Sequence, residues 1–349
     1  MSANRKRNAH LRRIVAIGLL FSFVVPTACS KKPFDDIPAG IAPAQAAPSP
    51  PVTQAPAGVV RPVDGRVQSA LFDGRTGQLA TLAFGPTSGA PSSLTLMDPQ
   101  QTSPRVIQLP GPATGLAGDN TGSVYLSTRG GYFVVDLTVG HTTRVSVRDA
   151  DHVDFSAITR RADGTVVLGT ADGTLYALGP GATEASRTAV HARVDSLAAQ
   201  GNTVAVLDRA QTSIVTLSAD GHIGQSLRAG QGATTMVADP AGRLLVADTR
   251  GGQLLVFGVD PLILRQAYPV AESPYGVVGS HGLAWVSQTS ANTVIGYDLS
   301  TGIPLEKVRY PSVRQPNALA FDDTAGTLYV VSGAGAGVQI IEHAATGPR

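Results

Sequence analysis

The chain has 349 residues, a formal net charge of +2 and 43% hydrophobic residues, which is enough for a substantial core. Its 39 glycines and 24 prolines favour many turns over long helices. Residues 1–28 hold five of the 27 basic residues and no acidic one, so the remainder carries 22 basic against 25 acidic residues, a net charge of −3. The excess of basic residues lies in this first segment alone, and we therefore set aside nucleic acid as a partner.

The chain begins with a basic stretch and an apolar run. Five arginines and lysines precede residues 14–25, which are all apolar except for one glycine and one serine. A run of 12 residues is too short to span a bilayer, which needs roughly 20. Residues 1–28 are therefore predicted to be a signal peptide, and Arg12-Arg13 leaves both Sec and twin-arginine export open.

Cys29 is the only cysteine of the chain, so no disulfide can form within it. It follows Thr27 and Ala28, which resembles the lipidation site of a bacterial lipoprotein signal, although Pro26 stands where that pattern usually has an aliphatic residue. The resemblance implies a lipid on Cys29 and anchoring to the extracytoplasmic face of the cell membrane. A plain secretory signal followed by a chance cysteine remains the alternative.

Residues 29–58 comprise the lipidation site and a stretch rich in proline and alanine. Seven of the 29 residues from 30 to 58 are proline, and no apolar period runs through them. This composition predicts a disordered, semi-rigid tether that could extend over roughly 90 Å.

From residue 59 to residue 349 one unit recurs seven times. Each copy has a short apolar strand, a turn, two further apolar strands joined by a polar loop, and usually a fourth strand. Aligned on their second strands, the copies are spaced by 38 to 45 residues, at Leu79, Val124, Val166, Val204, Leu244, Ala284 and Leu328. Four strands per 40–45 residues predict an all-β, seven-bladed propeller. The last copy lacks a fourth strand, and residues 58–63 are expected to supply it and to close the ring.

The repeat resembles the YVTN and NHL classes of propeller repeat. The sixth copy fits best, with Trp285-Val286, Asn292-Thr293-Val294 and Tyr297-Asp298 in place. With its leader, the chain is similar to the propeller lipoproteins of mycobacteria and related actinobacteria. The resemblance covers residues 59–349 and is specific for fold, whereas propellers carry many different functions.

In propellers, the loops between second and third strands and the loops leading into first strands meet at one mouth of the central channel. The sequence places a mixed-charge rim there, which could bind a polar ligand or a loop of a partner. Its members are Arg129, Asp154, Asp172, Asp195, Asp208, Arg209, Asp248, Arg250, Tyr275, Gln288, Asn292 and Asn317. A solvated loop surface is the plainer interpretation, in which Asp208 and Asp248 cap turns through backbone N–H groups.

The sequence gives little support for metal or nucleotide chemistry. The histidines after the leader are scattered without ligand spacing, and a divalent cation at the mouth would depend on Asp154, Asp195 and Asp248. The glycine-rich stretch 333–337 leads into a strand rather than a helix, which argues against a nucleotide. Trp285, Tyr125, Tyr176 and Tyr329 are expected to pack between blades.

We therefore expect no resident cofactor and a non-catalytic, membrane-anchored propeller that binds a protein or another component of the cell envelope. The alternative is a lactonase- or esterase-like hydrolase that uses a cation at the mouth. A structural spacer without a ligand also remains open.

Overall fold

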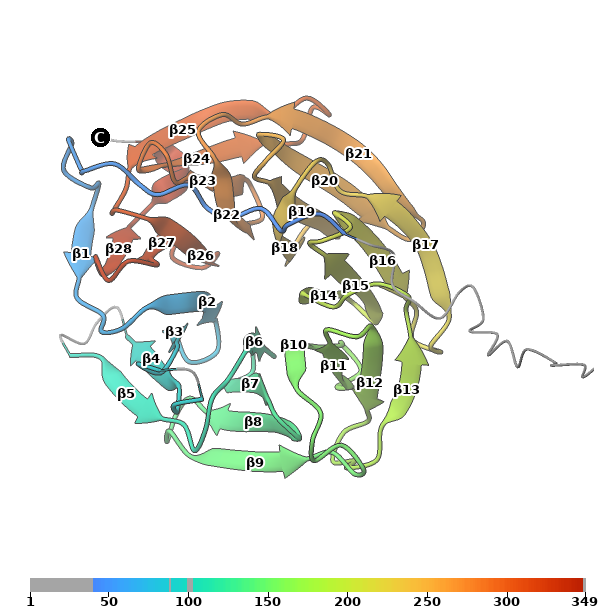
Figure 1. Cartoon of the computed structure of the whole chain (residues 1–349). Coiled ribbons are helices and arrows are strands. Elements are labelled where there is room, and N and C mark those ends of the chain that lie inside the picture. The colour runs from blue at the N-terminus through green and yellow to red at the C-terminus, as the bar shows by residue number, and fades with distance from the viewer. Residues whose placement is uncertain (1–39, 88, 99–102, 348–349) are drawn as a thin grey trace, which may run out of the picture. The chain divides into compact units, whose positions relative to one another are not determined.

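The computed structural model describes residues 40–87, 89–98 and 103–347. Within these residues, 28 strands form seven four-stranded antiparallel sheets and are followed by one short 3-10 helix, Ala344–Thr346. The sheets surround a central opening as the blades of a propeller (Figure 1). The predicted all-β, seven-bladed architecture is confirmed.

Each blade is an antiparallel meander of four strands. The first strand in the order lies beside the central channel, and the last lies at the outer edge. Blade 1 contains β2 (Val67–Asp73), β3 (Gln78–Ala83), β4 (Ser93–Met97) and β5 (Arg105–Gln108). Blade 2 contains β6 (Gly115–Gly118), β7 (Ser123–Thr128), β8 (Gly131–Asp136) and β9 (Thr142–Ser146). Blade 3 contains β10 (Phe155–Arg160), β11 (Val166–Thr170), β12 (Thr174–Leu178) and β13 (Ser186–Ala189).

The remaining blades repeat the same order. Blade 4 contains β14 (Ser196–Gln200), β15 (Thr203–Asp208), β16 (Ser213–Leu217) and β17 (Ile223–Arg228). Blade 5 contains β18 (Ala233–Asp239), β19 (Arg243–Asp248), β20 (Gln253–Val259) and β21 (Leu262–Pro269). Blade 6 contains β22 (Pro274–Gly279), β23 (Ala284–Gln288), β24 (Thr293–Asp298) and β25 (Leu305–Pro311). Blade 7 contains β26 (Pro316–Asp322), β27 (Thr327–Ser332), β28 (Val338–Ile341) and β1 (Val59–Arg61).

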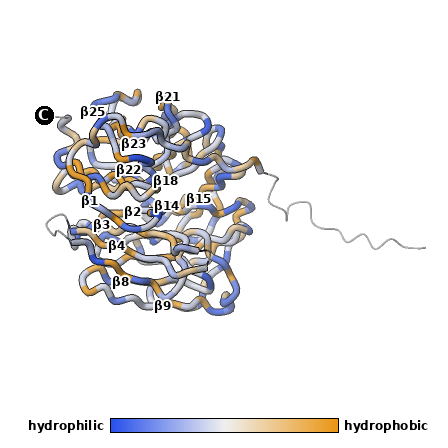
Figure 2. Tube along the Cα trace, turned by 60° about the vertical axis from the view of Figure 1, so that its left-hand side comes forward, coloured by the Kyte–Doolittle hydropathy of each residue, from blue (hydrophilic) through white to orange (hydrophobic). Residues whose placement is uncertain are grey.

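The core lies between blades, because a sheet with two apolar faces must bury both. Seven apolar clusters each join two neighbouring blades. Figure 2 shows apolar segments mainly along the strands and polar ones mainly in the loops. Trp285 is fully buried and stacks on Phe321 of the next blade, with ring centroids 5.7 Å apart. Tyr329 stacks on Phe72 of blade 1 at 5.5 Å, so the predicted packing of aromatic rings between blades is confirmed for these two.

The ring closes in blade 7 as the sequence predicted. Strand β1 pairs antiparallel with β28, with Val59 opposite Ile340 and Arg61 opposite Val338. The strand is shorter than the predicted 58–63. The buried Gln339 supports the seam, since its amide donates to the carbonyls of Ala57 at 2.8 Å and Pro311 at 2.9 Å.

The segment before β1 differs from the prediction of a disordered tether. Residues 41–57, which we call the strap, contain no strand or helix, yet they lie against the propeller and bond to blades 4, 5, 6 and 7. In Figure 1 the strap runs from β1 past β23 and β22 toward blade 4, beside the central opening. The prediction was wrong for this part because its contacts use main-chain atoms, which composition does not reveal.

The predicted signal peptide, Cys29 and the first part of the predicted tether lie outside the described residues. No helix in the described part of the chain has the length and apolar character needed to span a membrane.

Candidate functional site: the mouth of the propeller

The loops between second and third strands and the loops that lead into first strands lie on one face of the ring, because successive strands alternate in direction. We call this the mouth face. The strap crosses it over blades 4–7, whereas among the described residues blades 1–3 form no hydrogen bond with the strap. The mouth face thus has a covered half and an open half.

Two arginines of the predicted rim bind the strap. Arg209 of blade 4 donates from Nη2 to the carbonyl of Ala44 at 2.6 Å. Arg250 of blade 5 donates from Nη2 to the carbonyl of Ala42, also at 2.6 Å. Hydrogen bonds from a charged donor are stronger than neutral ones. These two rim residues therefore hold the chain's own N-terminal segment.

Asn292 of blade 6 is a third contact to the strap. Its side chain is only 6% exposed, and Nδ2 donates to the carbonyl of Pro50 at 2.9 Å. Its other polar atom, Oδ1, is buried without a hydrogen-bond partner among the described residues. A buried amide oxygen without a partner is uncommon in folded proteins and costs stability.

Gln315, which leads into blade 7, makes the densest contact with the strap and was missed by sequence reasoning. Its Oε1 accepts from the Ser49 backbone at 3.0 Å, and its own N–H donates to Ser49 Oγ at 2.9 Å. Its Nε2 donates to the carbonyl of Ala47 and to Oδ1 of Asn317, both at 3.1 Å. Ser49 is buried and donates in turn to the carbonyl of Thr289 at 2.6 Å.

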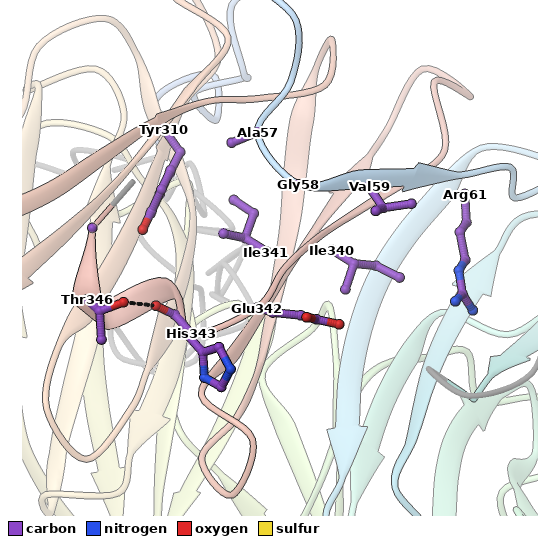
Figure 3. A pocket seen from close by; sticks show the side chains of 11 residues that line it. Ala57, Gly58, Val59, Arg61, Tyr310, Ile340, Ile341, Glu342, His343 and Thr346 are labelled. Atoms are coloured by element: carbon purple, nitrogen blue, oxygen red, sulfur yellow. Dashed lines mark hydrogen bonds between the residues drawn. The ribbon is translucent and has the colours of Figure 1, made fainter. Parts of the chain in front are cut away.

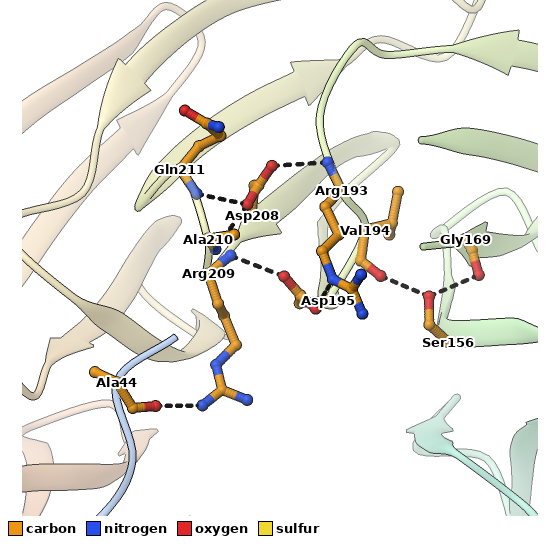
Figure 4. Close-up of polar contacts among 10 residues, drawn as sticks. All are labelled: Ala44, Ser156, Gly169, Arg193, Val194, Asp195, Asp208, Arg209, Ala210 and Gln211. Carbon is orange, nitrogen blue, oxygen red and sulfur yellow. Dashed lines mark hydrogen bonds and ion pairs between the residues drawn. The ribbon is translucent and has the colours of Figure 1, made fainter. Parts of the chain in front are cut away.

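Asp208 and Asp248 end the second strands of blades 4 and 5 and are fully buried. Each carboxylate accepts three backbone N–H groups, which join the loop leading into the blade to the loop after the second strand. Figure 4 shows this arrangement around Asp208. The donors are Arg193, Ala210 and Gln211 for Asp208, and Gln231, Gly232 and Gly251 for Asp248. The turn-capping interpretation of these two residues is confirmed.

Gln288 occupies the same position in blade 6. Its amide donates to the carbonyl of Ala271 at 2.8 Å, and its Oε1 accepts from Arg309 at 3.1 Å. Arg309 also donates two bonds to Glu306, at 2.8 and 2.7 Å, and these bonds lower the pKa of the Glu306 carboxyl. In three successive blades, the side chain at the end of the second strand is thus hydrogen bonded to the loop that leads into the blade.

Asp195, Tyr275 and Asn317 line the central channel, a cavity of about 530 Å³ surrounded by the seven innermost strands. Asp195 accepts from Arg193 Nε at 2.8 Å and from the Arg209 backbone at 2.9 Å, as Figure 4 shows. Its two oxygens are therefore already engaged by the protein.

On the open half, the predicted rim residues contact only their neighbours. Arg129 forms an ion pair with Asp154 at 3.5 Å, and both side chains are mostly exposed. Asp172 accepts from the Thr170 hydroxyl and, at 3.3 Å, from the Thr174 backbone. The structure does not gather these residues with the charged residues of blades 4 and 5 into one site.

The three carboxylates considered for a cation are engaged separately, Asp154 with Arg129, Asp195 with Arg193, and Asp248 with backbone N–H groups. Among the described residues, no group of three or more His, Cys, Asp or Glu side chains is arranged to hold a metal ion.

A cavity of about 1050 Å³ lies on the mouth face over blade 1. Its wall includes two apolar side chains that are about half exposed, Phe84 at 51% and Val106 at 48%. Other lining residues are Arg66, Pro86, Pro91 and Pro112. None of these residues was predicted from the sequence to belong to a site.

A further cavity of about 480 Å³ lies at the seam beside β1 (Figure 3). It is bounded by Arg61, Tyr310, Ile340, Glu342 and His343, among others. The Tyr310 hydroxyl donates a hydrogen bond to the carbonyl of Ala344 at 2.7 Å. No rim residue predicted from the sequence belongs to this cavity.

No protein-family model and no curated protein matches the sequence. The fold is similar to that of a streptogramin B lyase, with a TM-score of 0.66 and 11% identity over 82% of this chain and 97% of that chain. It is also similar to Kuenenia stuttgartiensis hydrazine synthase, with a TM-score of 0.63 and 12% identity over 83% and 99% of the two chains. U3-55K gives a TM-score of 0.64 and 12% identity over 85% and 100%. At such identities the likeness shows the propeller fold alone.

Proposed function

We propose that this protein is a membrane-anchored, extracytoplasmic lipoprotein whose propeller binds a protein or another component of the cell envelope without catalysis. The observation that carries the binding function is the cavity over blade 1, with Phe84 and Val106 exposed beside the open half of the mouth face. Exposed apolar side chains grouped in a hollow are typical of interaction sites. The resemblance to mycobacterial propeller lipoproteins supports the same proposal.

Binding is favoured over hydrolysis because the carboxylates on the mouth face already accept hydrogen bonds from the protein. A general base or a metal ligand needs a free lone pair directed at the substrate or ion. Asp208 and Asp248 instead direct both oxygens at backbone N–H groups, and Asp195 directs both at Arg193 and Arg209. These residues stabilise the loops of the mouth face.

In this proposal the lipid on Cys29 anchors the chain, and the strap connects the anchored segment to the propeller. The strap is fixed to the propeller from Ile41, whose N–H donates to the carbonyl of Ala210 at 2.9 Å. The part of the predicted tether from Ile41 onward therefore lies on the propeller and does not act as a spacer.

Two experiments test the proposal. Replacing Cys29 with serine should move the protein from the membrane fraction to the soluble fraction; retention in the membrane would contradict lipid anchoring.

The second experiment tests binding by crosslinking in intact cells. The crosslinked partner should be lost with the Phe84→Asp variant and retained with the Val139→Asp variant. Val139 is a matched control because it is also exposed, at 68%, but lies in the turn between β8 and β9 on the opposite face. Equal crosslinking by both variants would contradict the site.

A further inference from the structure

The covered half of the mouth face recognises the strap almost entirely through its main chain. Arg209, Arg250, Asn292 and Gln315 bond to strap carbonyls, and the side chain of Ser273 accepts from the Ala47 backbone at 3.1 Å. Within the described residues, Ser49 is the one strap residue whose side chain forms hydrogen bonds. Since main-chain groups are common to all residues, this surface selects an extended chain of small residues rather than one sequence.

The strap itself has few features that would make its docking permanent. Of residues 41–57, only Ala44 and Ser49 are buried, so little apolar area is removed from water. The strap also has no partner strand, and segments with few buried apolar contacts open at a low free-energy cost.

One bond is left unmade at Asn292. The Asn292 amide donates to the carbonyl of Pro50, but its buried Oδ1 receives no donor. Proline has no backbone N–H, so Pro50 cannot supply one. A different residue in this place would bring an N–H beside its carbonyl, and an asparagine amide can bond to both groups of one residue in an extended chain.

We propose that the surface formed by Arg209, Arg250, Ser273, Thr289, Asn292 and Gln315 is a binding site for an extended, alanine- and proline-rich segment of a partner polypeptide, and that the strap occupies this site until the partner displaces it. This inference rests on the proposed function in that the mouth face binds a partner. A partner segment with a residue other than proline at the Pro50 position gains a hydrogen bond that the strap lacks. Displacement would also expose the rim arginines.

The test uses residues 36–349, which form one compact unit, and a labelled synthetic peptide of residues 40–57. The tethered strap competes at an effective concentration in the millimolar range. The receptor therefore carries Ser49→Ala, which removes the one strap side chain that is hydrogen bonded. The peptide should bind this variant in a fluorescence polarisation titration, and it should bind the unaltered protein much more weakly.

Three peptides then test the role of Asn292. A Pro50→Ala peptide should bind about fivefold tighter than the parent, the effect of one added hydrogen bond. A Pro48→Ala peptide is the matched control, since it loses a proline ring without placing an N–H beside Asn292. With Asn292→Ala in the receptor, the advantage of the Pro50→Ala peptide should disappear. Equal binding of the two alanine peptides, or an advantage that survives Asn292→Ala, would overturn the inference.

Hydrogen exchange on the unaltered protein decides the matter if no peptide binds. The N–H groups of Ile41, Ala47 and Ser49, which bond to the propeller, should exchange at least tenfold faster than those of β15 and β19. Exchange as slow as in these strands would show a permanently docked strap and overturn the proposal. Because these experiments use purified protein and no envelope, they are independent of the crosslinking at Phe84 that tests the proposed function.

Discussion

The covered and open halves of the mouth face use the same residue type in the same loop for different purposes. Arg129, Arg209 and Arg250 all follow the second strand of their blade. On the covered half, Arg209 and Arg250 donate to strap carbonyls at 2.6 Å. On the open half, Arg129 forms an exposed ion pair with Asp154, an interaction that contributes little stability. A loop residue's role thus depends on which distant segment lies over it.

The largest expected effect is at Gly58, where the strap ends and β1 begins. Gly58 has a φ of +72°, and an added Cβ would lie 2.1 Å from the carbonyl oxygen of Ile340. We expect Gly58→Ala to lower the free energy of unfolding by about 3 kcal/mol, because it disturbs both the strap and the closing strand. Urea unfolding followed by tryptophan fluorescence measures this, since Trp285 packs against blade 7.

Gly77, in blade 1, is the control for this substitution. Its φ is +67°, but an added Cβ would meet nothing within 4 Å. Gly77→Ala should therefore cost only about 1 kcal/mol, the strain of the backbone alone. Equal losses for the two variants would show that the seam at Gly58 is not specially constrained.

The second effect concerns the buried turn carboxylates of the covered half. Asp248→Ala leaves the N–H groups of Gln231, Gly232 and Gly251 without their acceptor, which should cost about 2–3 kcal/mol. Asp172→Ala, on the open half, should cost less than about 0.5 kcal/mol because its side chain is exposed. Thermal unfolding of both variants measures the difference, and a loss at Asp172 as large as that at Asp248 would remove the distinction between the two halves.

A smaller effect is expected when the arginines are removed one at a time. Arg209→Ala should speed amide exchange in the strap about tenfold, the effect of losing one charge-assisted hydrogen bond, with little change in global unfolding. Arg129→Ala should leave strap exchange unchanged, because Arg129 bonds to Asp154 and not to the strap. The comparison fails if strap exchange responds equally to both substitutions.

The smallest effect is pH dependent and involves Glu306 and Arg309 behind Gln288. The bonds from Arg309 hold the pKa of the Glu306 carboxyl below its ordinary 4.5, so the pair stabilises the fold above that value and its contribution is lost as the pH falls. Because the two side chains are 38% and 49% exposed, the contribution is below about 0.5 kcal/mol. Between about pH 6 and about pH 3, the unaltered protein should lose slightly more stability than Glu306→Gln. An identical loss would show that the pair adds nothing.

The fold could be predicted from the sequence because its signals are local and repeated. The second strands at Leu79, Val204 and Leu328 are apolar in every copy, and all three residues are fully buried. The strap could not be predicted, because its bonds come from carbonyls such as those of Ala42 and Ala44, which any sequence has. Ser49 is the one strap residue whose side chain is hydrogen bonded among the described residues, and a single serine between prolines carries no pattern.

The candidate site was located in part. The rim positions of Arg209, Arg250 and Asn292 were predicted on the mouth face, but the segment they bind was expected to be disordered. Gln315 was missed because a lone glutamine before a proline carries no pattern. The blade 1 cavity was missed because its apolar wall residues, Phe84 just after β3 and Val106 in β5, read as ordinary propeller sequence.

The path of the strap has a mechanical consequence. A force applied at the N-terminal end of the strap first loads the bonds at Ala210 and Arg250, then those at Gln315 and Asn292, and only afterwards the seam at Gln339. Bonds loaded one after another break one after another, so the strap would detach progressively from its N-terminal end while the ring stays closed. A pull on the N-terminal side would thus free the strap before it loaded the strand that closes the ring.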